Sequence, residues 1–312
     1  MSNTDKQIIT QFSDHLDIIF KDMNEVTITR EDIDEAEIII GYPPRKYLKM
    51  ASKLRWLQTI TAGVETYLTD NILSDDIILT NASGSYGESQ SEFMFSMLIS
   101  LMKKLHIYRD NQQDSRWLDE GDVMMLRGST AIVIGLGDIG SEFARLLKAF
   151  GVYVIGVRRD STKNCVYADE IYSFTDLDRH IHRADILGMV IPATPETVHL
   201  MDANRIAMMK EGSILVNTGR GTTVDNEALC DELESGRLAG AALDVFEPEP
   251  IPVNHRAWKI KNLLITPHAA GQDFMPHNWQ KTLQLIEDNL RAYNEGKELR
   301  NIVDRSIYEF KS

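Results

Sequence analysis

The sequence predicts an α/β protein of two domains, the larger of which is built on a doubly wound parallel sheet. Short apolar runs alternate with amphipathic stretches along most of the chain, and a glycine-spaced turn joins one such run to a helix. The 312 residues are 43% hydrophobic, which is enough for two cores. We expect residues 1–97 and 277–312 to form a smaller, discontinuous domain and residues 98–276 to form the larger one.

The smaller domain is predicted from three short apolar strands separated by acidic or helical stretches. The strands are expected at 38–40, 54–60 and 77–79, and the helices at 30–37 and 45–53. The loop of Ala62, Gly63 and Val64 follows the second strand. Ligands bind at the carboxyl ends of parallel strands, so the N–H groups of this loop are candidates for holding a small anion. A plain turn from strand to helix is the alternative.

A long helix is predicted over 87–110, where Phe93, Met97, Leu98, Leu101 and Leu105 fall on one side. Its Met and Phe content is typical of a core or a subunit interface.

The larger domain opens with an apolar strand at 131–134, followed by Gly135, Gly137 and Gly140 in the spacing G-x-G-x-x-G. The first glycine permits a tight turn, the second allows close approach of a pyrophosphate, and the third lets the helix pack on the strand. An amphipathic helix and a second apolar strand follow, which predicts dinucleotide binding by these glycines together with Asp138 and Ile139. A purely structural strand–helix–strand unit is the alternative.

The choice of dinucleotide depends on the end of the second strand, where an acidic residue typically binds the ribose of NAD. Here Arg158 and Arg159 occupy that place, and arginine pairs well with a 2'-phosphate. We therefore favour NADP(H) as the cofactor, while the neighbouring Asp160 keeps NAD(H) open.

The rest of the larger domain continues the alternation of strands and helices, which predicts a parallel sheet covered on both faces. Strands are expected at 185–191, 213–217, 241–243 and 263–265, and helices at 177–183, 204–210 and 226–234. A last helix is predicted over 277–295.

Three polar clusters follow strands of this domain, at the edge where ligands bind. Arg220 lies between two glycines, where it could hold a carboxylate and polarise a carbonyl group, or form a surface salt bridge. An acidic, proline-stiffened loop at 244–250 could mount a carboxylate, or be an ordinary surface loop. His268 is followed by small residues that leave room for a cofactor. Arginine, carboxylate and histidine beside a nicotinamide would suit carbonyl reduction.

Composition excludes several other classes of protein. The formal net charge of −14 disfavours a nucleic-acid partner, and no apolar run approaches the ~18 residues needed to span a membrane. Two cysteines are too few for a disulfide framework, and no histidine or cysteine pair has the spacing of metal ligands. We expect a cytoplasmic protein without a metal site.

Seven segments at family-like spacing resemble the D-isomer-specific 2-hydroxyacid dehydrogenases, and the Arg158-Arg159 pair resembles the glyoxylate and hydroxypyruvate reductases that use NADPH. The seven segments are LRWLQTITAGVE, NASGSYGESQSEF, GSTAIVIGLGDIG, VIPATPETVHLM, MKEGSILVNTGRG, ALDVFEPEP and LLITPHAAG. The resemblance implies a Rossmann-like dinucleotide domain with a smaller flavodoxin-like substrate domain, and a homodimer. It also implies hydride transfer between nicotinamide and a small 2-oxo acid or 2-hydroxy acid.

The resemblance also implies a role for individual residues. Arg220 corresponds to the substrate-binding arginine, His268 to the acid/base histidine, and Glu249 to the glutamate that supports it. Ala62, Gly63 and Val64 match the loop that binds the substrate carboxylate. Asp244 matches the residue that holds the nicotinamide carboxamide, and Pro192, Thr218 and Gly271 are further expected cofactor contacts. A nucleotide-sensing, corepressor-like binding protein on the same fold is the alternative function.

Overall fold

The computed structural model describes residues 2–12, 16–22, 27–70, 72–272 and 275–309. It divides into two compact units: unit 1, made of Met1–Ser85 and Gln272–Ser312, and unit 2, made of Tyr86–Gly271. Each unit contains a parallel sheet with helices, so the predicted α/β class is confirmed. Among the described residues, no helix is both long and apolar enough to cross a membrane.

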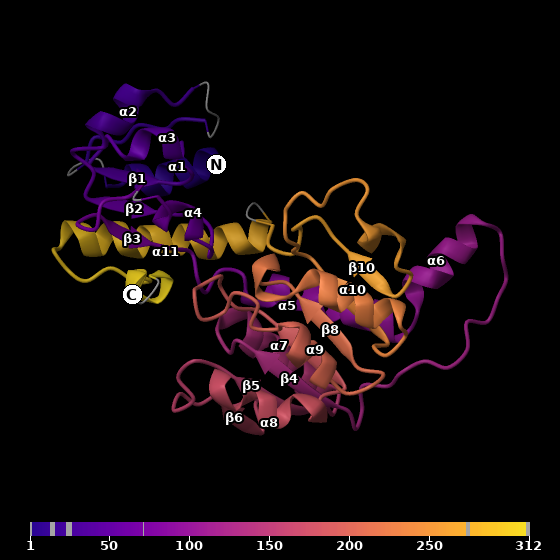
Figure 1. Cartoon of the computed structure of the whole chain (residues 1–312). Coiled ribbons are helices and arrows are strands. Elements are labelled where there is room, and N and C mark those ends of the chain that lie inside the picture. The colour runs from indigo at the N-terminus through magenta and orange to yellow at the C-terminus, as the bar shows by residue number, and fades with distance from the viewer. Residues whose placement is uncertain (1, 13–15, 23–26, 71, 273–274, 310–312) are drawn as a thin grey trace. The chain divides into compact units, whose positions relative to one another are not determined.

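Unit 2 is built on a seven-stranded parallel sheet (Figure 1). Its strands are β4 (Thr130–Ile134), β5 (Tyr153–Val157), β6 (Glu170–Tyr172), β7 (Ile186–Met189), β8 (Ile214–Asn217), β9 (Gly240–Leu243) and β10 (Leu263–Ile265). Their order is β10-β9-β8-β7-β4-β5-β6, so the chain builds outward from β4 first in one direction and then in the other. The sheet is therefore doubly wound, and the strand order reverses between β4 and β7, which is the place where open parallel sheets bind ligands.

Helices cover both faces of this sheet, as the alternation of side chains along β4 requires. Ala131 and Val133 belong to a buried cluster with residues of α5 (Gly87–Met102) and α7 (Asp138–Ala149). Ile132 and Ile134 point to the other face and pack in a cluster with residues of α8 (Leu177–His180), α9 (Ala203–Met208) and α10 (Asn226–Glu234).

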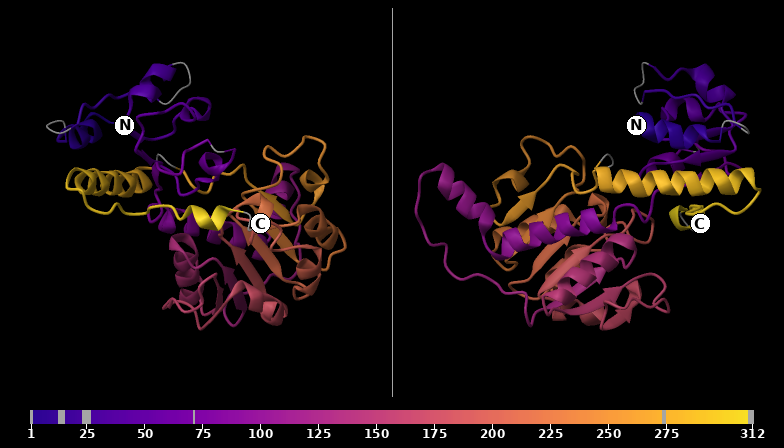
Figure 2. Two further views of the ribbon diagram at one scale, coloured as in Figure 1. Left: turned by 60° about the vertical axis from the view of Figure 1, so that its left-hand side comes forward. Right: turned by 180° about the vertical axis from the view of Figure 1, so that it is seen from behind.

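The single helix predicted over 87–110 is wrong, because the chain forms two helices there. α5 ends at Met102, Lys104 adopts a left-handed conformation with φ of 55°, and α6 (Leu105–Gln113) then leaves in a new direction. Figure 2 shows α6 and the extended segment after it standing away from the sheet of unit 2. The side-chain amines of Lys103 and Lys104 bond backbone carbonyls of that returning segment, at Met124 and Glu120.

The boundaries between the units also differ from the expected ones. They fall at 85/86 and 271/272, whereas the sequence placed them at 97/98 and 276/277. The first difference arises because the whole of α5 packs along α7, which assigns the helix to unit 2.

Unit 1 contains a three-stranded parallel sheet in the order β1-β2-β3. Its elements are β1 (Ile38–Ile40), β2 (Trp56–Gln58), β3 (Ile78–Thr80), α1 (Asn3–Thr10), α2 (Arg30–Glu35), α3 (Arg45–Leu48), α4 (Glu65–Leu68) and α11 (Pro276–Asn294). Trp56 packs in a cluster with residues of α1 and α11, whereas Leu57 packs in another with residues of α2, α3 and α4. The sheet is therefore covered on both faces.

A buried amide pair joins this sheet to α11. The Asn289 side chain donates to Gln58 Oε1 at 2.9 Å and to the Arg300 carbonyl at 3.1 Å, and it accepts from the Arg300 N–H at 2.7 Å. Gln58 and Asn289 are both fully buried. The N-terminal and C-terminal segments of unit 1 are thus joined by polar contacts as well as by apolar packing.

Candidate active site

Three neighbouring strands of unit 2 carry the residues predicted to perform chemistry. Arg220 follows β8, Glu249 lies in the loop after β9, and His268 follows β10. β8, β9 and β10 are adjacent and parallel, so their carboxyl ends meet at one edge of the sheet (Figure 1). Residues far apart in the sequence are thereby brought to one site.

The imidazole of His268 and the carboxylate of Glu249 form a hydrogen-bonded pair, with Nδ1 and Oε2 2.8 Å apart. The other oxygen, Oε1, accepts the N–H of Phe246 at 2.9 Å. This second bond fixes the position of the carboxylate. Because an ionised carboxylate can only accept hydrogen bonds, His268 donates from Nδ1. The ring then keeps Nε2 for proton exchange with a ligand.

Each partner alters the pKa of the other. The hydrogen bond to Glu249 raises the pKa of His268 above its ordinary value, and this outweighs the opposing effect of partial burial. Burial acts to raise the pKa of Glu249, but the bonds from His268 and Phe246 outweigh it, so this pKa lies below the usual value. The pair therefore favours an ionised carboxylate next to a protonated imidazole.

Arg220 lies close enough for its charge to act on both members of this pair, lowering the pKa of each. The turn that presents it is pinned by Asn217, a fully buried residue at the end of β8. The Asn217 side chain donates to the Arg220 carbonyl at 3.0 Å and accepts the Gly219 N–H at 3.0 Å. The buried strand end thus fixes the backbone from which the Arg220 side chain extends.

The loops after β8 and β9 touch directly through Gly221. A Cβ built at this residue would lie only 2.1 Å from the carbonyl carbon and oxygen of Phe246. Phe246 is the residue whose N–H holds Glu249. Only glycine permits this approach, so the backbone beside Arg220 supports the backbone that positions the carboxylate.

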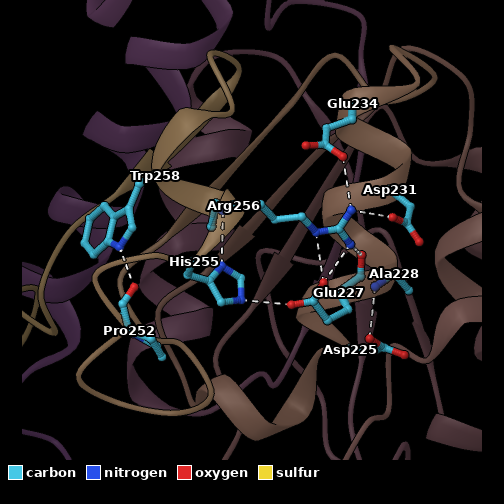
Figure 3. A network of polar contacts seen from close by, with 10 residues as sticks. Asp225, Glu227, Ala228, Asp231, Glu234, Pro252, His255, Arg256 and Trp258 are labelled. Carbon is cyan, nitrogen blue, oxygen red and sulfur yellow. Dashed lines mark hydrogen bonds and ion pairs between the residues drawn. The ribbon is translucent and has the colours of Figure 1, made fainter.

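The segment after Glu249 is tied to α10 by a polar network (Figure 3). Arg256 contacts Glu227, Asp231 and Glu234 at distances of 2.6 to 3.0 Å. His255 accepts the N–H of Ala257 at Nδ1, so its neutral ring carries the proton on Nε2, which lies 2.8 Å from Glu227.

The ring of His255 also packs edge-on against Phe246, with 5.1 Å between the centroids. The Trp258 indole donates to the Pro252 carbonyl and closes the loop between them (Figure 3). His255 therefore supports the site from outside, through the residue that holds Glu249.

The glycine-spaced turn has the close contacts that its sequence predicts. A Cβ at Gly135 would lie 2.3 Å from the Val190 carbonyl oxygen, and one at Gly140 would lie 1.7 Å from the Gly135 carbonyl oxygen. A Cβ at Gly137 would meet nothing within 4 Å, so this glycine faces open space at the N-terminus of α7. A backbone that is open at a helix N-terminus fits a pyrophosphate group.

The two residues inside the motif differ in exposure. Asp138 is exposed, and its carboxylate lies against Gly87 of α5, where a Cβ would be 2.3 Å from Oδ1. Ile139 is half-buried.

Arg158 and Arg159 directly follow β5, on the other side of β4 from the loops that carry Arg220 and His268. The Arg159 side chain pairs with Glu196 at 2.8 Å, and both are about half exposed. Arg158 contacts the Lys163 carbonyl at 3.4 Å. The carboxylate of Asp160 caps the next turn by accepting from Thr162.

The other predicted cofactor residues lie at the same edge of unit 2. Pro192 is exposed, and its carbonyl accepts the Thr197 hydroxyl at 2.7 Å, which folds the loop after β7. Thr218 is buried, and its carbonyl accepts the Gln90 amide at 2.8 Å. Gly271 lies beside Gln90, with 3.5 Å from a built Cβ to the amide oxygen.

Asp244 is 1% exposed, and both of its carboxylate oxygens accept hydrogen bonds from the loop that contains His268.

The predicted anion loop belongs to unit 1, between β2 and α4. Asn81 donates to the Ala62 carbonyl at 2.8 Å, and the Thr61 hydroxyl donates to the Gly63 carbonyl at 2.9 Å. Val64 is fully buried and accepts the N–H of Tyr67 at 2.9 Å. These contacts order the loop and direct three of its carbonyl groups into the fold.

Sequence reasoning did not single out Gly221 as a supporting residue, nor did it single out Phe246, Thr266 and Glu196. Their contacts join segments that lie far apart in the chain, and none has a local pattern that marks it. Among the described residues, no group of three or more His, Cys, Asp or Glu side chains could hold a metal ion.

Comparison with known proteins gives consistent matches. Residues 95–270 match the family model of the D-isomer specific 2-hydroxyacid dehydrogenase, NAD binding domain. A glyoxylate reductase from Aeropyrum pernix is 32% identical over 272 residues, covering 85% of this chain and 80% of the relative.

Two solved structures are similar over most of their length. A D-isomer specific 2-hydroxyacid dehydrogenase family protein from Aeromonas salmonicida is 33% identical with a TM-score of 0.84, covering 97% of this chain and 96% of its own. An NADPH-dependent glyoxylate/hydroxypyruvate reductase from Sinorhizobium meliloti, in complex with NADP and sulfate, is 25% identical with a TM-score of 0.79. That match covers 88% of this chain and 87% of the other.

Proposed function

Because the chain belongs to the family of D-isomer specific 2-hydroxyacid dehydrogenases, we propose that it reduces a small 2-oxo acid to a D-2-hydroxy acid. The observation that carries this proposal is the 2.8 Å contact between His268 and Glu249, at the edge of the sheet that also presents Arg220. Histidine, carboxylate and arginine are the groups that proton donation to a carbonyl beside a carboxylate requires.

In the proposed reaction a bound nicotinamide supplies the hydride for C2 of the oxo acid. Arg220 binds the substrate carboxylate and stabilises the negative charge that develops on the carbonyl oxygen. His268 gives its Nε2 proton to that oxygen, which completes the hydroxyl group. Glu249 holds the imidazole by its Nδ1 and stabilises its protonated form.

We further propose that unit 2 binds the dinucleotide and that Ala62, Gly63 and Val64 of unit 1 bind the substrate carboxylate through their N–H groups. NADP(H) is the favoured cofactor, and NAD(H) is a second candidate. Arg158 and Arg159 support this preference, because two guanidinium groups after β5 suit a 2'-phosphate. A relative whose name states NADPH dependence is consistent with it.

The proposed function is tested by following the oxidation of NADPH, and of NADH in parallel, with a panel of 2-oxo acids. We expect turnover of at least one small acid, faster with NADPH. Inactivity across the panel, in a folded protein that binds NADPH, would favour the corepressor-like alternative.

Two arginine variants sharpen this test. Arg220→Ala should lower kcat/KM by roughly 10³-fold or more, because carboxylate binding and carbonyl polarisation are lost together. Arg179→Ala is the matched control, since the side chain of Arg179 is 79% exposed and lies outside the site, and it should keep parental kinetics. Near-parental turnover of Arg220→Ala would remove Arg220 from its role.

We also propose that the protein forms a homodimer through α6 and the segment that follows it. Five large apolar residues of this region are exposed: Leu105 (50%), Trp117 (102%), Leu118 (52%), Val123 (46%) and Met125 (69%). A fully exposed tryptophan among other exposed apolar side chains is typical of an interface. Light scattering on the wild type and on Trp117→Ser tests this proposal, and a monomeric wild type would refute it.

A further inference from the structure

The backbone of His268 is held in an unusual conformation. Its φ is 54°, in the left-handed region that residues other than glycine rarely adopt. Such a conformation persists only where the surrounding contacts impose it. The His268 N–H donates to the Asp244 carbonyl at 2.7 Å, so Asp244 contacts the residue through its own backbone.

The side chain of Asp244 accepts hydrogen bonds from the same loop on both sides of His268. Before the histidine, the Thr266 hydroxyl donates to Oδ1 at 2.5 Å. After it, the N–H groups of Ala269 and Ala270 donate to Oδ1 at 2.8 Å and to Oδ2 at 3.0 Å. The carboxylate is buried, and three donors offset the cost of removing it from water.

We propose that Asp244 and Thr266 form a clamp that holds His268 in its left-handed conformation and so keeps the imidazole against Glu249. The inference rests on the proposed role of His268 as proton donor. Thr266 is then a positioning residue, which acts through Asp244 and the loop backbone. A carboxylate has about four acceptor sites, so three clamp bonds leave one for a cofactor amide.

The clamp makes a specific prediction about Thr266, because valine has nearly the shape of threonine without its hydroxyl group. Thr266→Val should lower kcat by about tenfold, as expected for the loss of a hydrogen bond to a charged group. Thr266→Ser keeps the hydroxyl and should restore most of the activity. The Kd for NADPH, measured by fluorescence, should stay within about twofold in both variants, since Thr266 acts on the histidine loop.

The pKa of His268 gives a readout that does not require turnover. Glu249, Arg220 and Asp244 are the charged groups that act on this imidazole, and the bond to Glu249 raises its pKa. If Thr266→Val loosens the loop, that bond weakens and the pKa of His268 falls. NMR titration of the full chain measures this, with the His268 signal assigned by its absence from His268→Asn.

The outcomes separate the clamp from the proposed function. A lower His268 pKa in Thr266→Val, restored in Thr266→Ser, supports the clamp even if no 2-oxo acid is reduced. Identical titration and kcat in the wild type and Thr266→Val would overturn it. A change confined to the Kd for NADPH would also overturn it, because Thr266 would then act on the cofactor.

A second variant addresses the other half of the clamp. Asp244→Asn presents an NH₂ group to donors that need an acceptor, so it should lower the His268 pKa further than Thr266→Val. Thermal unfolding and NADPH binding show whether this variant is folded. A folded Asp244→Asn with an unchanged His268 pKa would refute the clamp.

Discussion

Gly221 offers a sharp test of how the site is held together, because the substitution to alanine adds one methyl group at a known place. That Cβ would lie 2.1 Å from the carbonyl group of Phe246, whereas ordinary contacts are 3.4 to 4 Å. The Phe246 backbone, or the turn after Arg220, must therefore move by about 1 Å or more. Phe246 holds Glu249 by its N–H, so the movement reaches the carboxylate.

The expected size of the effect follows from that displacement. A misplacement of about 1 Å in a group that orients a proton donor costs on the order of 100-fold in rate. We therefore expect Gly221→Ala to lower kcat by about 100-fold, while the Kd for NADPH changes by less than about threefold. The Kd for NADPH should change little because the predicted cofactor turn is formed by β4 and α7, and not by the loop that contains Phe246.

The assay is steady-state NADPH oxidation with the best acid of the panel, together with NADPH binding by fluorescence and thermal unfolding. Gly212→Ala is a suitable control, because Gly212 has φ of 75° and open space around it. That variant should lose stability through backbone strain without losing activity. A folded Gly221→Ala enzyme with near-parental kcat would refute the mechanical link between Gly221 and Glu249.

Three further changes have expected outcomes. Glu249→Gln should lower the pKa of His268, so kcat/KM for reduction should fall off at lower pH than in the wild type, as a pH–rate profile will show. Glu196→Gln should tighten NADPH binding by about two- to fivefold without changing NADH binding, because it frees Arg159 for a 2'-phosphate. Asn289→Ala should destabilise unit 1 by about 2 kcal/mol or more in denaturant unfolding, since it leaves buried polar groups unpaired.

The sign of the pH effect follows from the direction of proton transfer. Reduction needs protonated His268, so its rate declines as pH rises through that pKa, and the carboxylate of Glu249 moves this decline to higher pH. A descending limb of the pH–rate profile that does not move in Glu249→Gln would contradict the pairing.

The other two predictions have matched controls. For Glu196→Gln, the control is Glu211→Gln, which removes an exposed carboxylate away from Arg159 and so controls for net charge. Asn294→Ala, at an exposed position of α11, controls for the stability test.

Much of the fold of unit 2 could be predicted because its strands are continuous apolar runs separated by short helices. β4, β8 and β10 were found within a residue at each end, and the glycine turn was found through its spacing. β6 was not expected, because Glu170-Ile171-Tyr172 is only three residues long and contains no apolar run. The break at Lys104 was missed because no glycine marks its left-handed conformation.

The candidate site also has a part that the sequence could predict and a part that it could not. The types of residue at the ends of β8 and β10 indicated carbonyl chemistry without any structure, because Arg220 and His268 each follow a buried strand. What local patterns could not supply are contacts between loops, such as Gly221 against Phe246. These depend on which strands are neighbours, and strand order is not encoded in any single segment.

The supporting contacts explain how a loop with a large acidic content can hold one carboxylate at a defined place. Arg256 fixes the far end of the loop to α10, His255 packs on Phe246, and Gly221 supports Phe246 from the other side. Glu249 is then bonded to a backbone N–H that cannot easily move. Stiffness is useful here because the proton donor is itself held in a left-handed conformation, so a flexible partner would let the ring turn away.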